Sequence, residues 1–179
     1  MDSQQMQQLV EEELLSSYDS LYRLAYSYVK NEPDAMDIVQ ESAYKAIKHA
    51  SSLKEKSHAR TWIWRIAINT SLEFLRRRQQ EIPASMPQEQ GKEDKYCDFD
   101  TLSALDILNE KERAVIILRY FEDRKLQEIA HALEENLNTT KSILYRSLKK
   151  LKAKLTEGET SHEPYPPKKL PKYLKGDPR

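Results

Sequence analysis

The stretch over residues 126–155 constrains the fold most, because its pattern indicates two helices separated by a short polar break. Four apolar residues of its first part recur at 3- and 4-residue spacing and share a helical face: Leu126, Ile129, Ala130 and Leu133. Polar residues 134–136 interrupt that face, and Asn136 is the one among them that best tolerates a left-handed backbone. We expect Asn138 or Thr139 to cap the second helix through its side-chain oxygen. Helix, break and helix in this order are typical of a helix-turn-helix.

The second helix of this stretch is amphipathic and basic. Its expected buried residues are spaced 4, 3 and 4 apart: Leu144, Leu148, Leu151 and Leu155. Residues 137–155 include six basic side chains and no acidic one, and the N-terminal part of such a helix enters the DNA major groove in a helix-turn-helix. A solvated charged face is the alternative. We favour DNA contact up to Arg146 and a solvated face for the lysines beyond Lys149.

The formal net charge of zero conceals a segregation of charge along the 179 residues. Residues 1–57 carry ten acids and six bases, whereas residues 58–79 carry five arginines and a single acid. Residues 80–112 carry nine acids and three lysines. Separate acidic and basic blocks indicate separate surfaces for separate partners, and a basic surface attracts phosphate in a salt-sensitive way.

Composition narrows the class of protein further. Three glycines and no alternating strand pattern predict an all-α chain, long enough for one ordinary domain or two small ones. The single cysteine, Cys97, cannot form an internal disulfide, and the four histidines lack ligand spacing, so we expect no metal and no cofactor. The sequence shows no nucleophile–base pair and no phosphate-binding glycine loop, so we expect no enzymatic activity. The polar start and the lack of a long apolar run predict a cytoplasmic protein without signal peptide or membrane span.

We expect a first helical domain over residues 5–79. Its second helix carries Asp34 and Asp37, and the helix dipole offers a structural explanation for both, because it favours carboxylates in a first turn. A solvated face would explain Gln40 and Glu41. The predicted helices cover 5–30, 33–50 and 58–79, with a polar loop at 51–57.

Two tryptophans stand beside arginines in the third predicted helix. Such a tryptophan is either a core anchor whose basic neighbours extend to water, or an aromatic surface for an unpaired base. We assign Trp64 to the core and leave Trp62 open between the two.

The composition changes after this helix. Residues 80–100 contain two prolines, a glycine and many acids, which predicts a flexible linker. A second helical domain is expected over 101–155, and the proline- and lysine-rich residues 156–179 are expected to be disordered. Before the helix-turn-helix, this second domain should contain helices near 101–108 and 110–121.

Three blocks of this sequence together resemble the extracytoplasmic-function, or group IV, sigma factors of bacterial RNA polymerase, within the sigma-70 family. The resemblance covers about residues 10–155, and all three blocks in this order are highly specific. They are DAMDIVQESAYKAI (34–47), TWIWRIAINTSLEFLRRR (61–78), and LNEKERAVIILRYFEDRKLQEIAHAL (108–133) with NTTKSILYRSLKKL (138–151).

The resemblance implies roles for residues of the first domain. Its first block is similar to the part that binds the β′ subunit of core polymerase, and its second to the part that melts and reads the −10 promoter element, where the preceding loop supplies a pocket for a flipped base. The matching polymerase-binding positions are Asp34, Asp37, Gln40 and Glu41. The matching −10 positions are Trp62, Arg65, Asn69, Arg76 and Arg77.

The second domain is similar to the reader of the −35 element, which also binds the β subunit. Three positions depart from the family: Glu134 replaces the usual glycine of the turn, Thr140 a valine, and Ile143 a common arginine. A turn pivoting on Asn136 would accommodate the first departure. The matching −35 positions are Thr139, Lys141, Ser142, Tyr145 and Arg146, whose side chains suit phosphates or base edges.

The resemblance therefore implies a subunit that directs RNA polymerase to promoter DNA, is no enzyme itself, and is held inactive by an anti-sigma factor that is often membrane-anchored. Two other functions compete with this one. The chain could act as a stand-alone helix-turn-helix regulator, or as an interaction protein that binds polymerase without reading DNA.

Overall fold

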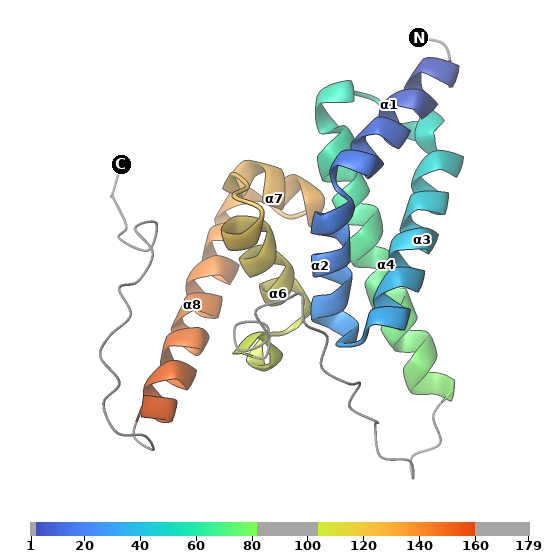
Figure 1. Cartoon of the computed structure of the whole chain (residues 1–179). Coiled ribbons are helices and arrows are strands. Elements are labelled where there is room, and N and C mark those ends of the chain that lie inside the picture. Colours follow the sequence, from blue (N-terminus) through green and yellow to red (C-terminus); the bar gives the residue numbers. More distant parts are fainter. Residues whose placement is uncertain (1–2, 82–103, 160–179) are drawn as a thin grey trace.

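The computed structural model describes residues 3–81 and 104–159, and every regular element in these ranges is helical (Figure 1). The predicted all-α class and the division into two helical domains are confirmed. Most of the predicted linker and tail lies outside the described residues, although α4 and α8 run a few residues past their predicted ends.

The first domain is a bundle in which α2, α3 and α4 pack against one another and α1 lies across one end (Figure 1). Asn31 caps α3, because its side-chain oxygen accepts the backbone N–H of Asp34 at 2.9 Å. Two 3-10 turns occupy the predicted polar loop before α4. The elements are α1 (Ser3–Ser16), α2 (Tyr18–Val29), α3 (Glu32–Lys48), η1 (Ala50–Ser52), η2 (Lys56–His58) and α4 (Ala59–Glu81).

The prediction of one helix over residues 5–30 is wrong, because the chain breaks at Ser17 into α1 and α2. Ser16 and Ser17 donate their hydroxyl groups to the carbonyl and carboxylate of Glu13. Such local side-chain bonds give the backbone an alternative to the helical ladder. Arg60 of α4 also bonds to Glu13, which ties the break to the bundle.

In the second domain, α6 and α7 both pack against the long helix α8. The helix predicted near 101–108 is a 3-10 turn in its described part, and the helix predicted over 110–121 changes to a π-helix after Ile116. There the N–H of Glu122 reaches back to the carbonyl of Ile117. The elements are η3 (Ala104–Ile107), α6 (Glu110–Ile116), η4 (Ile117–Phe121), α7 (Leu126–Ala132) and α8 (Leu137–Glu159).

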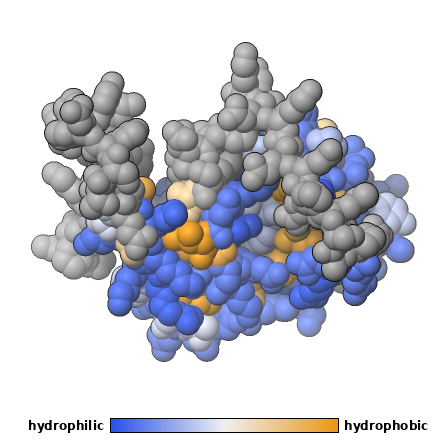
Figure 2. Space-filling model, turned by 90° about the horizontal axis from the view of Figure 1, so that it is seen from below, coloured by the Kyte–Doolittle hydropathy of each residue, from blue (hydrophilic) through white to orange (hydrophobic). Residues whose placement is uncertain are grey.

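The buried apolar residues of both domains form one continuous cluster, which includes Trp64 of α4 and Ile129 of α7. Trp64 is 1 % exposed, so its assignment to the core is confirmed. Seen from below, the surface is mainly hydrophilic and its hydrophobic areas are separate patches (Figure 2). Within the described ranges, no helix combines the length and the apolar character that crossing a membrane requires.

Candidate nucleic-acid and polymerase interfaces

The turn between α7 and α8 fixes where α8 begins. Glu134 has a φ of 54°, so it, and not Asn136, is the left-handed residue of the break. This conformation lets the N–H of Glu135 return to the carbonyl of Ala130 at 2.9 Å and close α7. Asn136 instead caps α8, because its side-chain oxygen accepts the N–H of Thr139 at 2.8 Å. The prediction of a cap at Asn138 or Thr139 is therefore wrong by two or three residues.

The first turns of α8 carry the residues predicted for duplex DNA. Lys141, Ser142 and Arg146 are exposed, and Tyr145 is 70 % exposed. Thr139 is half-buried at the cap. Among the described residues, no carboxylate forms an ion pair with Lys141 or Arg146. Lys141 and Arg146 therefore present exposed cationic groups that form no ion pair with these residues, although the charge of Arg146 contributes to the lowered pKa of Glu112.

The opposite face of α8 anchors the helix to its domain. Ile143 and Leu144 are buried, and the Thr140 hydroxyl donates to the carbonyl of Asn136. Leu155, predicted to be buried, is 63 % exposed, because the last turns of α8 extend beyond α6 (Figure 1). Ile143, where the family has a common arginine, consequently belongs to the core and presents no group to DNA.

A buried carboxylate supports α8 from behind. Glu112 is 3 % exposed, accepts a hydrogen bond from Nζ of Lys150 at 2.7 Å, and forms a capping box with Asn109 at the start of α6. Burial alone would raise the pKa of the Glu112 carboxyl, but the bonds from Lys150 and from the backbone of Asn109 outweigh it, and the pKa lies below its usual value. An ionised Glu112 therefore holds α6 and α8 together.

The residues predicted to bind polymerase lie along α3 in two different environments. Asp37 and Gln40 are exposed, and neither side chain forms an ion pair or a hydrogen bond with another described residue. Asp34 is half-buried and pairs with Arg78 of α4. Asp37 lies beyond the first turn of α3, whose acids are Glu32 and Asp34, so the helix dipole does not explain it.

Glu41 takes part in a network between α3 and α4. It pairs with Lys45 at 3.0 Å and with Arg77 at 3.1 Å, and Lys45 also reaches Glu73 at 2.7 Å. Burial would raise the pKa of the Glu41 carboxyl, but hydrogen bonds from Lys45 and Arg77 lower it below its usual value. One residue of the predicted polymerase set is thus bonded to one of the predicted −10 set.

The remaining residues predicted to read the −10 element lie along α4. Asn69 and Arg76 are exposed, whereas Trp62 is half-buried. Trp62 lines a hollow of about 440 Å³ between α4 and the preceding loop, together with Leu53 and Lys54. The sequence left open whether Trp62 belongs to the core or is available for stacking; the structure places it at the edge of a cavity.

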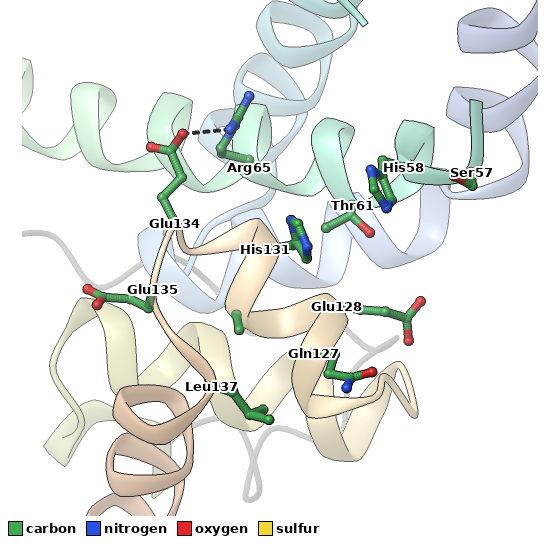
Figure 3. Close-up of a pocket in the computed structure, with 11 residues that line it drawn as sticks. Ser57, His58, Thr61, Arg65, Gln127, Glu128, His131, Glu134, Glu135 and Leu137 are labelled. Atoms are coloured by element: carbon green, nitrogen blue, oxygen red, sulfur yellow. Dashed lines mark hydrogen bonds and ion pairs between the residues drawn. The ribbon is translucent and has the colours of Figure 1, made fainter. Parts of the chain in front are cut away.

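Arg65, the other member of this set, faces a cleft of about 700 Å³ between α4 and α7 (Figure 3). Its guanidinium lies 2.6 Å from the carboxylate of Glu134, in the turn of the second domain. In the same cleft the rings of His58 and His131 stack with centroids 5.1 Å apart. The structure therefore brings a predicted −10 residue against the helix-turn-helix.

Sequence reasoning missed a group of residues between the two domains. The guanidinium of Arg124 lies 4.7 Å from the centroid of Trp64, and Glu122 bonds to Ser20 and Arg23 of α2. The sequence contained no sign of these contacts, since a pairing over about a hundred residues leaves no local pattern.

Comparison with known proteins places the chain among described families. The family models Sigma-70 region 2 and Sigma-70, region 4 match residues 14–81 and 104–153. The chain is 43 % identical over 145 residues to RNA polymerase sigma factor SigV of Bacillus subtilis, covering 78 % of this chain and 87 % of that protein. It is 31 % identical over 150 residues to RNA polymerase sigma-E factor of Streptomyces coelicolor, covering 81 % and 85 %.

Two solved structures share the architecture. The sigma factor RpoE in complex with the anti-sigma factor NepR, from Bartonella quintana, aligns with a TM-score of 0.66 and 25 % identity over 82 % of this chain and 96 % of that one. CnrH in complex with the cytosolic domain of CnrY aligns with a TM-score of 0.64 over 87 % and 99 %; at 19 % identity this match shows the fold alone.

Proposed function

Because the chain belongs to the sigma-70 family, as an extracytoplasmic-function sigma factor that directs bacterial RNA polymerase to promoters, we propose that its two domains divide promoter recognition between them. Residues 5–79 bind core polymerase and the −10 element. Residues 101–155 bind the −35 element.

The observation that carries this assignment is the exposed basic face at the start of α8, whose cations form no ion pair among the described residues. Lys141 and Arg146 are exposed beside Tyr145 on a helix whose other side is fixed by Glu112 and by buried apolar residues. A rigid helix with exposed cations at its N-terminal end suits the major groove, where arginine and lysine bond to guanine O6 and N7 or to phosphate.

In the first domain, α3 supplies the polymerase-binding surface. Asp37 and Gln40 are available for a partner as they stand, whereas Asp34 and Glu41 must exchange Arg78 and Arg77 for groups of the β′ subunit. The same exchange frees Arg77 for the DNA backbone. Polymerase binding and exposure of the −10 residues are coupled in this proposal.

The −10 element is read as single strand on α4. The hollow beside Trp62 accepts a base that has left the stack, and an aromatic wall contributes about 1–3 kcal/mol per stacked base. Arg65, Asn69 and Arg76 then contact the strand along the exposed side of α4. The protein itself catalyses no step; polymerase performs the chemistry.

Regulation by an anti-sigma factor completes the proposal. One structural neighbour, the sigma factor RpoE, is in complex with the anti-sigma factor NepR. We place the protein in the cytoplasm, where a membrane-anchored anti-sigma factor would hold it at the inner face.

Run-off transcription with purified core polymerase tests the function. Core alone should not initiate at a cognate promoter, and adding the protein should start transcription; equal transcription without it would refute the proposal. The double substitution Lys141→Ala and Arg146→Ala should abolish −35-dependent initiation.

The matched control for that variant removes the same charge farther along the same helix, at Lys152 and Lys154, which are exposed on α8. It should retain most of the activity. An interaction protein that does not read DNA would tolerate both double variants, and a stand-alone regulator would bind the promoter equally well without core polymerase.

A further inference from the structure

A row of side chains runs along the outer side of α3, among the residues predicted to bind polymerase. Met36, Gln40, Tyr44 and Lys48 recur every fourth residue, so they share one side of the helix. Tyr44 is 63 % exposed, and Nζ of Lys48 lies 5.6 Å from the centroid of its ring. This side of α3 therefore presents a large aromatic side chain to solvent.

The packing of the first domain does not explain an aromatic residue at position 44. The buried face of α3 consists of Ala35, Ile38, Val39, Ser42 and Ala46. At about 100° per residue, Tyr44 lies on the opposite side of the helix from that face. A ring that remains this exposed buries little apolar area and so contributes little to folding. Its surface is available to a partner.

A second tyrosine continues this surface from α3 onto α2, which packs beside it (Figure 1). Tyr18 is the first residue of α2 and is 43 % exposed. Its hydroxyl donates to Sδ of Met36 at 3.1 Å, so its ring reaches the near end of the row. We name Tyr18, Met36, Gln40 and Tyr44 the tyrosine row. It joins two helices into one surface with an aromatic side chain toward each end.

The tyrosine row is continuous with the residues predicted to bind polymerase. Gln40 belongs to it, and Asp37 follows Met36 directly and is as exposed as Gln40. Asp19, next to Tyr18, is exposed as well. Carboxylates at these positions repel the phosphates of DNA, which excludes DNA as the partner of this surface. They suit a protein surface that combines apolar side chains with cations.

Tyrosines and carboxylates contribute to such an interface in different ways. A tyrosine brings a large, rigid apolar area at low cost in conformational entropy, and tyrosines are enriched among the residues that dominate binding energy. Exposed charges at the rim act mainly on the rate of encounter, and salt weakens their effect. Dissociation rates account for most differences in affinity between variants of one interface.

We propose that Tyr18 and Tyr44 hold core polymerase through an apolar patch of the β′ subunit flanked by basic residues, whereas Asp37 accelerates the encounter. This inference rests on the proposed function and adds to its polymerase-binding residues two aromatic side chains, one of which lies outside α3. The partner's basic residues face Asp19 and Asp37, and its apolar patch covers Met36 and the two rings.

Binding kinetics on immobilised core polymerase test this division. Tyr44→Ala should weaken binding by about tenfold to thirtyfold, almost entirely through faster dissociation, and to the same extent at low and high salt. Tyr44→Phe keeps the ring and should retain most of the affinity. Tyr18→Ala should have a smaller effect, about three- to tenfold, because less of its ring is exposed.

Asp37→Asn should behave in the opposite way. It removes the charge while keeping the size of the side chain, so it should slow association and leave dissociation nearly unchanged. Its effect should disappear as the salt concentration rises. A salt-independent loss of affinity for Asp37→Asn, equal to that of Tyr44→Ala, would contradict the separate roles.

Tyr120→Ala is the matched control, because Tyr120 is 38 % exposed, close to Tyr18, but belongs to η4 of the second domain. It should bind core as the wild type does. Urea unfolding of each variant identifies losses that arise from misfolding. Tyr44→Ala should unfold at nearly the same urea concentration as the wild type, since its side chain lies outside the core.

A wild-type dissociation rate for Tyr44→Ala would overturn the proposal. So would a monomer–dimer equilibrium that Tyr44→Ala shifts in sedimentation while core binding stays unchanged, because the tyrosine row would then join two copies of this chain. If the wild type itself neither binds core nor starts run-off transcription, the proposed function fails instead. The two failures are therefore distinguishable.

Discussion

The two basic surfaces of the molecule are in opposite electrostatic states. On α8, Lys141 and Arg146 have no ion pair among the described residues, whereas on α4, Arg65 and Arg77 are matched by Glu134 and Glu41. Two helices with similar numbers of basic residues therefore differ in how available those residues are for DNA. In the proposed function, the −35 surface on α8 can therefore meet phosphate as it is, whereas the −10 surface on α4 must first exchange its carboxylates.

The largest expected effect concerns packing, because α4 is a structural helix as well as a reader. Trp64→Ala should lower the free energy of unfolding by about 3–5 kcal/mol, since it removes a fully buried aromatic side chain beneath the second domain. Urea unfolding followed by circular dichroism measures this. The half-buried Trp62 serves as the control, and Trp62→Ala should cost clearly less; equal losses would show that both tryptophans are core residues.

Glu112→Gln tests how far α8 depends on the carboxylate behind it. The variant leaves Lys150 without its partner and should destabilise the protein by about 2 kcal/mol at pH 7, less than a fully buried pair because Lys150 is half exposed. The folded pKa of Glu112 is lowered, so the stabilisation is present above the ordinary carboxyl pKa and is lost as the pH falls through the lower folded value.

Unfolding at pH 7 and at pH 3 distinguishes this from a steric effect. The difference in the free energy of unfolding between wild type and variant should shrink at the lower pH. A difference independent of pH would mean that glutamine disturbs packing and that the ion pair is unimportant.

Single arginine substitutions test the electrostatic contrast directly. Arg146→Ala should weaken binding of holoenzyme to a −35-dependent promoter by about tenfold to a hundredfold, as expected for loss of one base or phosphate contact. Arg77→Ala should have a smaller effect, because its loss also releases Glu41 from an existing pair. Binding measured over a range of salt concentrations should give the shallower slope for Arg146→Ala. Equal effects of the two variants would remove the distinction between the surfaces.

The sequence predicted the helices that depend on local periodicity. It did not predict the features that depend on particular hydrogen bonds or on contacts between distant residues. The helices α3, α4, α7 and α8 follow from apolar spacing. The break at Ser17 was missed because it is made by hydroxyl bonds that leave helical periodicity intact. The identity of the left-handed residue was missed because intrinsic preference favours Asn136, whereas closure of α7 requires that conformation at Glu134.

The candidate site divides in the same way. Through their resemblance to the family, three sequence blocks predicted the polymerase, −10 and −35 positions, whose roles stay predictions. They could not show that Arg65 is bonded to Glu134 or Arg78 to Asp34, because these pairs join segments separated by 69 and 44 residues. Whether a charged group is free or compensated is a property of the tertiary structure.

The carboxylates of α3 extend the contrast between free and compensated charge to polymerase binding, with the smallest expected effect. Asp37→Lys should weaken binding to core polymerase by about three- to tenfold and leave unfolding nearly unchanged, since Asp37 is exposed and beyond the first helical turn. Asp34→Lys should reduce both binding and stability, because it places two cations where Asp34 now bonds Arg78 and Asn31. A pull-down with core polymerase and a urea titration of each variant separate the two cases. If Asp37→Lys binds core as tightly as the wild type, Asp37 belongs to the solvated face of α3, and compensation by α4 no longer distinguishes the two carboxylates functionally.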